Sequence, residues 1–208
     1  MRPVWFFGLG AVSGLFSAAI IVFWHIGDVS APQIAGYCFG LRISSRCDGV
    51  DATFYLFPGA LFGILFAALW SRRGGIGLGR FIAFTGASAI ANAVAVFVCV
   101  WLTDRLSAAM DIGFLDLPAA IAGVISFLNL PTAIAGAIAG AAGGVLLGGA
   151  AAALFPGLRL RRSIIAASSL GLLVPLVLIW EIVGVFVFFI VWQAGYAAAL
   201  ASSLPDDA

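Results

Sequence analysis

The chain has 208 residues, of which 63% are hydrophobic and 9% are charged. Soluble domains are about one quarter charged, so this composition excludes an ordinary soluble protein and predicts an integral membrane protein. Ten arginines nearly balance nine acidic residues, so no net field attracts nucleic acid. The partners we expect are the lipid bilayer and either a second copy of the chain or another membrane protein.

Apolar runs long enough to cross a bilayer follow one another along the chain. A helix needs roughly 20 residues to span about 30 Å of hydrocarbon. The sequence predicts one domain with five such helices, at residues 4–26, 54–70, 81–102, 132–155 and 164–192, and a short helix at 118–128. The expected fold class is therefore all-α, a polytopic membrane helix bundle.

The first apolar run is followed by Val-Ser-Ala at residues 29–31, which resembles a signal-peptidase site. The run is longer than the usual signal-peptide core, and Pro32 would follow the cut. We therefore expect the first span to be retained; cleavage would leave four spans in the same orientation.

Two cysteines, Cys38 and Cys47, lie in the loop after the first span, which is expected outside the cytoplasm, where disulfides persist. A structural disulfide is the first hypothesis, two free thiols are the second, and thiol redox chemistry is the third. A Cys-x-x-Cys motif does not occur, which weakens the redox hypothesis.

The third span carries a polar stripe of Thr85, Ser88, Asn92 and Cys99, whose spacing places them on one helix face. Asn92 lies at the middle of the span. Interhelical hydrogen bonding is the first interpretation of this stripe, and a polar site shared with another helix is the second.

The region 116–136 contains two similar octets, DLPAAIAG and NLPTAIAG. Asp116 and Asn129 are typical N-cap residues, and a proline two places later fits a first helical turn. Each octet therefore predicts a helix start. The short helix 118–128 is expected to be interfacial or re-entrant, and the alternative is one long helix kinked at Pro131.

The fourth span has glycines at every fourth position, namely Gly136, Gly140, Gly144 and Gly148. Such spacing allows another helix to approach closely, and it predicts a helix-packing seam. The sequence leaves open whether this seam packs within the chain or against a second copy.

Glu181 is the one ionisable residue well inside a predicted span, where a carboxylate costs about 2.5 kcal/mol or more. One hypothesis makes it a proton or cation site, with Asn92, Ser88 and Thr85 as candidate polar neighbours. The other makes it a protonated side chain that fixes helix packing. Pro175, six residues earlier, adds a potential hinge.

The distribution of arginines predicts the topology. With five spans, seven arginines share one side, against Arg42, Arg46 and Arg105 on the other. The positive-inside rule then predicts an inner-membrane protein with its amino terminus in the cytoplasm and its carboxyl terminus outside.

Three functions compete. The first is a non-enzymatic structural or accessory subunit, the second a small transporter or channel subunit using Glu181, and the third a membrane thiol oxidoreductase. The single histidine, His25, is too little for a hydrolytic triad or a zinc site, and no phosphate-binding loop is present. We therefore expect no cofactor and no metal, and we lean away from an enzyme.

Overall fold

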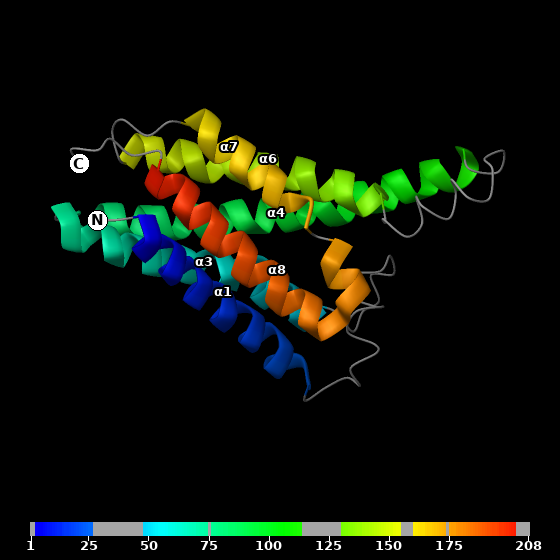
Figure 1. Ribbon diagram of the computed structural model, residues 1–208, viewed down its shortest axis with the longest axis horizontal. Helices are drawn as coiled ribbons and strands as arrows, with labels where there is room; N and C mark the ends of the chain where they lie inside the picture. The colour runs from blue at the N-terminus through cyan, green and yellow to red at the C-terminus, as the bar shows by residue number, and fades with distance from the viewer. Residues whose placement is uncertain are drawn as a thin grey trace.

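The computed structural model describes residues 3–26, 48–74, 76–113, 130–154, 160–173 and 175–202. They form the helices α1 (Pro3–Ile26), α3 (Asp48–Gly74), α4 (Leu78–Gly113), α6 (Leu130–Leu154), α7 (Leu160–Gly171) and α8 (Pro175–Ser202). The described residues contain no strand, so the predicted all-α helix bundle is confirmed (Figure 1). The predicted short helix at 118–128 and the loop cysteines Cys38 and Cys47 lie outside the described residues.

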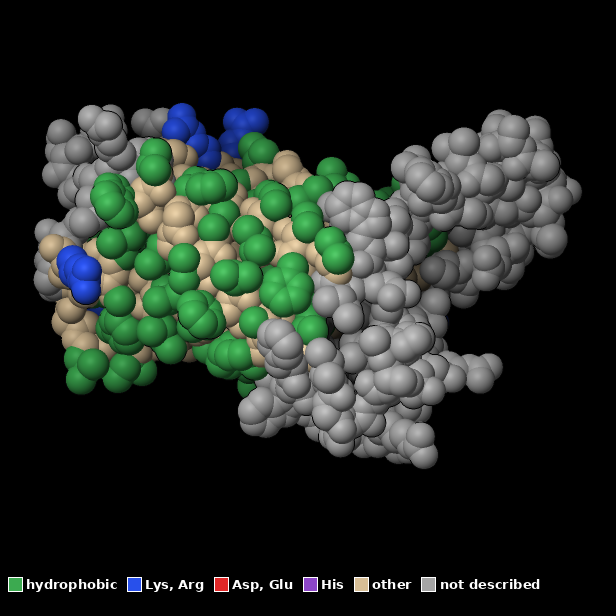
Figure 2. Space-filling model, turned by 60° about the horizontal axis from the view of Figure 1, so that its bottom comes forward, with side chains coloured by type: hydrophobic (Ala, Val, Ile, Leu, Met, Phe, Trp, Pro, Cys, Tyr) green, Lys and Arg blue, Asp and Glu red, His purple; other side chains and the backbone are tan. Residues whose placement is uncertain are grey.

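Four helical segments are long and apolar enough to cross a membrane, namely Val4–Val22, Leu78–Thr103, Leu130–Leu154 and Val183–Ser202. Leu56–Arg72 in α3 is a shorter apolar segment. Large hydrophobic side chains such as Trp5, Ile82 and Phe97 are more than half exposed, and hydrophobic side chains cover much of the visible surface (Figure 2). Apolar exposure on this scale is compatible with an integral membrane protein, whose outer surface meets lipid.

The last apolar run differs from the prediction of one span at 164–192. The structure ends α7 at Gly171 and begins α8 at Pro175. Leu172 and Leu173 donate backbone hydrogen bonds to the carbonyls of Ser169 and Leu170, three residues back, which tightens the last turn of α7. Pro175 has no N–H to continue this ladder, which accounts for the break.

The helices form a closed ring in which α1, α3, α4, α6, α7 and α8 each pack against the next, and α8 packs against α1. Along the ring, Gly10 and Gly14 of α1 lie against the backbone of Gln193 and Phe189 in α8, so these two helices run antiparallel. The start of α1 therefore lies beside the end of α8 (Figure 1).

The exposed side chains Arg72, Arg80, Arg161 and Arg162 lie near the end of α3 and near the starts of α4 and α7, and we call this end of the bundle the arginine end. Arg162 at the start of α7 donates from Nη1 to the carbonyl oxygen of Ser202 at the end of α8, over 3.3 Å. In the structure the start of α1 and the end of α8 lie at the same end of the bundle. The expectation that the two chain termini lie on opposite sides of the membrane stays a prediction. The compartment that each end faces stays a prediction.

Candidate functional site

The buried side chains of the bundle interior are aromatic, polar or aliphatic at different positions along its length. Toward the arginine end lies a cluster of buried aromatic rings, Phe6, Phe62, Phe66, Trp70, Phe84 and Tyr196. Phe66 is its centre, with ring centroids 5.3 Å from Phe6 and 5.5 Å from Phe84. A second apolar cluster, Ala18, Ile21, Val22, Val185 and Phe189, lies nearer the other end, between α1 and α8. Polar side chains with buried atoms adjoin the first cluster, and we call them the polar layer: Ser13, Ser17, Thr85, Ser88, Asn92 and Gln193. On α4, Thr85 and Ser88 lie between Phe84 and Ala91 of the first cluster.

Gln193 of α8 is fully buried and joins three helices. Its Nε2 donates to Ser17 Oγ in α1 over 3.2 Å and to the carbonyl oxygen of Pro58 in α3 over 3.4 Å. Pro58 is itself fully buried and sits inside α3. Because proline removes one main-chain hydrogen bond from a helix, α3 has a weakened turn at the point where Gln193 contacts it.

The α4 part of the polar layer meets α3 at the next residue, Gly59. A methyl group at Gly59 would lie 2.6 Å from Cβ of Asn92, and one at Gly63 would lie 2.9 Å from Cβ of Ser88. Both distances are shorter than a van der Waals contact, so only glycine allows this approach of α3 and α4. Polar side chains from α1, α4 and α8 thus surround Pro58 and Gly59.

Four side-chain oxygens in the polar layer are buried and have no hydrogen-bond partner among the described residues: Ser13 Oγ, Thr85 Oγ1, Ser88 Oγ and Gln193 Oε1. An unbonded buried group costs about 1–3 kcal/mol. Gln193 lies nine residues before the end of α8 at Ser202, roughly 14 Å along the helix, which is near the middle of a hydrocarbon layer about 30 Å thick. The polar layer therefore has unused hydrogen-bonding capacity in the bundle interior.

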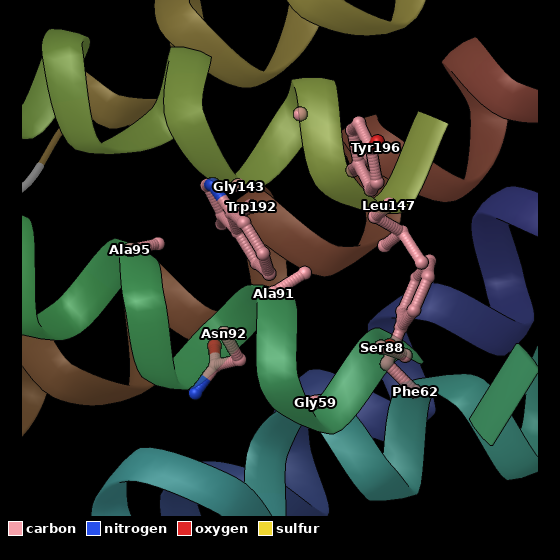
Figure 3. A pocket seen from close by; sticks show the side chains of 11 residues that line it. Gly59, Phe62, Ser88, Ala91, Asn92, Ala95, Gly143, Leu147, Trp192 and Tyr196 are labelled. Carbon is pink, nitrogen blue, oxygen red and sulfur yellow. The ribbon is translucent and has the colours of Figure 1, made fainter. Parts of the chain in front are cut away.

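A small cavity of about 10 Å³ adjoins the polar layer. Side chains from α3, α4, α6 and α8 converge on it, as Figure 3 shows, and they include Phe62, Ser88, Asn92, Leu147, Trp192 and Tyr196. Its lining contains no ionisable side chain other than the phenol of Tyr196. This volume is close to the roughly 10–15 Å³ that one water needs, but the lining is mostly apolar. Of the four residues with an unbonded oxygen, only Ser88 lines the cavity.

The structure brings together three of the four polar residues predicted to form a site, and it places Glu181 at a different depth in the bundle from the other three. Thr85, Ser88 and Asn92 share the face of α4 that meets α3. Glu181 lies in α8, 21 residues before Ser202. That separation is roughly 32 Å along a helix, about the whole hydrocarbon thickness from the arginine end. The side chain of Glu181 lies outside the described residues, and at the level of Asn92 the residue of α8 is Gln193.

The predicted glycine seam lies inside the bundle. Gly136, Gly140, Gly144 and Gly148 are all buried. A methyl group at Gly140 would collide with the backbone of Ala167 in α7, and one at Gly171 would collide with the carbonyl of Gly136. Gly143, which the four-residue spacing omits, packs against Ala91 and Ala95 of α4. Whether any of these glycines also contacts a second copy of the chain stays a prediction.

Sequence reasoning missed Gln193 and Pro58. The predicted last span ended at Trp192, so Gln193 fell one residue beyond it and was not considered. Its amide within an apolar stretch was the available signal. Cys99 is half-buried in α4, and no cluster of potential metal ligands occurs among the described residues.

Comparison of the chain with protein-family models, with curated proteins and with solved structures found no match.

Proposed function

We propose that the chain is a small membrane transport protein whose polar layer binds a small, neutral, hydrogen-bonding solute. The observation that carries this proposal is the group of four buried oxygens without a protein partner, on Ser13, Thr85, Ser88 and Gln193. Groups that only fixed helix packing would be expected to bond to one another, because unbonded polar groups are costly in an apolar interior. These oxygens come from three helices, and each has acceptor capacity that no group among the described residues uses.

The chemistry of the polar layer supports a neutral solute. Its hydroxyl and amide groups both donate and accept hydrogen bonds, and none of them is ionised. A charged solute at this depth would require a compensating charge, and the described side chains of the layer offer none. The cavity of about 10 Å³ favours a solute of water size in the conformation described.

Two apolar clusters adjoin the polar layer, and we interpret this conformation as an occluded state. Passage toward the arginine end requires the aromatic rings around Phe66 to move. Pro58 lies inside α3 and removes a main-chain hydrogen bond there, and Pro175 marks the break between α7 and α8; such sites are where helices bend.

Two other hypotheses predict different behaviour. A proton or cation site at Glu181 predicts flux that follows a pH gradient and that Glu181→Gln abolishes. An accessory subunit predicts no flux and a fixed partner, and its support from glycine seams is weakened because Gly140 and Gly171 contact helices of the same chain. The thiol oxidoreductase hypothesis depends on Cys38 and Cys47, which lie outside the described residues.

Proteoliposomes test the proposal. The purified chain is reconstituted, and entry of water, urea and glycerol is followed by stopped-flow light scattering with and without a pH gradient. We expect the wild-type chain to raise permeability to at least one of these solutes above that of empty liposomes. Gln193→Met and Ser88→Ala should lower it toward the empty-liposome value.

Ser71→Ala is the matched control, because Ser71 Oγ donates locally to the carbonyl of Ala68 near the end of α3 and lies away from the polar layer. Its permeability should equal that of the wild type. Wild-type liposomes that are no more permeable than empty ones to any of the three solutes would contradict the proposal. Flux that appears only with a pH gradient would favour Glu181 instead.

A further inference from the structure

Exposed arginines gather at one end of the bundle among the described residues. Arg72 near the end of α3, Arg80 near the start of α4, and Arg161 and Arg162 near the start of α7 are exposed at the arginine end. The other ends of α3 and α4 carry Asp48, Asp51, Asp104 and Asp111 along the helix sequence, with Arg105 as a basic residue among them. No ion pair involves the four exposed arginines within the described part of the chain, and helices α4 and α7 have no acidic residue in their first turns.

The surface beside these arginines is apolar. Leu78 is 74% exposed two residues before Arg80, and Ile165 is 54% exposed three residues after Arg162. Each pair of charges therefore borders side chains that are suited to lipid tails. Arg162 donates one hydrogen bond to the Ser202 carbonyl, which fixes its position, and the guanidinium has further N–H donors.

From this juxtaposition we propose that the arginine end binds the phosphate groups of anionic phospholipids, at Arg161 and Arg162 on α7 and at Arg72 and Arg80 around the α3–α4 turn. Guanidinium groups match phosphate oxygens with paired hydrogen bonds, and a phospholipid places its phosphate next to its acyl chains. This pattern of charge against apolar surface fits a lipid better than a soluble phosphate. The proposal requires a membrane location but is independent of the transported solute.

Native mass spectrometry of the detergent-purified full-length chain tests this proposal. The chain is titrated with phosphatidylglycerol or phosphatidylcholine of the same acyl composition, and with glycerol phosphate as a soluble anion. The variants are Arg161→Gln with Arg162→Gln, Arg72→Gln with Arg80→Gln, and the single control Arg105→Gln. Arg105 is a suitable control because it is exposed at the opposite end and lies over the Trp101 ring, 5.8 Å from its centroid.

We expect the wild-type chain to bind phosphatidylglycerol more tightly than phosphatidylcholine. Each arginine removed should weaken phosphatidylglycerol binding by about fivefold, the ratio that about 1 kcal/mol per basic residue produces near an anionic surface. Arg105→Gln should leave the preference unchanged, and glycerol phosphate should not compete. Equal binding of the two lipids, or an equal loss in Arg105→Gln, would overturn the proposal, and so would efficient competition by glycerol phosphate. Circular dichroism of each variant checks that the helices are intact.

Discussion

Gln193 of the last helix donates a hydrogen bond to Ser17 of the first helix over 3.2 Å, deep inside an apolar bundle. Together with the bond from Gln193 to the Pro58 carbonyl, it links α8, α1 and α3 at one level. The same level holds buried oxygens that lack a protein partner, and this is the basis for the transport proposal.

Replacement of Gln193 by methionine should separate function from stability. Methionine has a similar length and no polar group, and interhelical hydrogen bonds in membranes are worth only about 0.6 kcal/mol on average. We therefore expect the free energy of unfolding in detergent to change by less than about 1.5 kcal/mol for the two bonds lost, while solute permeability falls. A large loss of stability with unchanged permeability would assign Gln193 to helix packing.

Close packing of α1 and α8 depends on the absence of a side chain at Gly14. A methyl group there would lie 2.6 Å from the Cα of Ile190. Gly14→Ala should lower the free energy of unfolding by about 1–3 kcal/mol, the usual effect of overpacking. Gly8→Ala on the same helix is the control, because a methyl group at Gly8 has no neighbour within 4 Å, and this variant should be as stable as the wild type. Equal free energies of unfolding for Gly14→Ala and Gly8→Ala would contradict the close packing of α1 against α8.

The seam between α6 and α7 can be tested in the same way at Gly140. Gly140→Ala places a methyl group 3.3 Å from the Cα of Ser168 and closer still to the backbone of Ala167, and it should destabilise the chain. Gly149→Ala, where a methyl group meets open space, should not. Sedimentation in detergent adds a second reading: if Gly140→Ala disperses an oligomer without changing the stability of the monomer, the seam packs against a second copy.

Phe62 lines the cavity and belongs to the aromatic cluster toward the arginine end. Phe62→Ala should enlarge the interior there and raise solute permeability, although truncation of a buried phenylalanine destabilises a protein by about 3–5 kcal/mol. Phe7→Ala is the control, since Phe7 is 53% exposed on the outside of α1. Permeability that does not rise in Phe62→Ala, with the helices intact by circular dichroism, would contradict the role of the aromatic cluster as a barrier.

Much of the fold follows from the distribution of apolar residues along the chain. Hydropathy identifies the helical class and places the third span close to the start of α4, and the start of α6 follows from the Asn-Leu-Pro sequence at residues 129–131. The break between α7 and α8 could not be located in this way, because residues 164–202 are apolar almost throughout. Apolar residues on either side of Pro175 are equally soluble in lipid, so hydropathy does not show where the last crossing begins. The missing N–H of Pro175 and the packing against α6 and α1 determine it.

Only part of the candidate site could be predicted from the sequence, because the ends of the last helix could not be located. Thr85, Ser88 and Asn92 recur at helical spacing within one clear span, and this spacing alone places them on one face. Gln193 could be predicted as a site residue only if the position of α8 relative to the membrane were known. Glu181 received attention because its charge is conspicuous, but a single charged residue does not reveal its depth when the ends of the helix are misplaced.

Labelling of single cysteines tests the central claim that α8 returns to the arginine end and thereby places Gln193 at mid-membrane. Cys38, Cys47 and Cys99 are first replaced by serine, and one cysteine is then introduced in place of Ser202, Arg162 or Arg105. A membrane-impermeant maleimide is applied from each side of the membrane. We predict that Ser202→Cys and Arg162→Cys react from one side and Arg105→Cys from the other. Reaction of Ser202→Cys from the side of Arg105→Cys would contradict the account, because residues 164–192 would then cross the membrane as a single span.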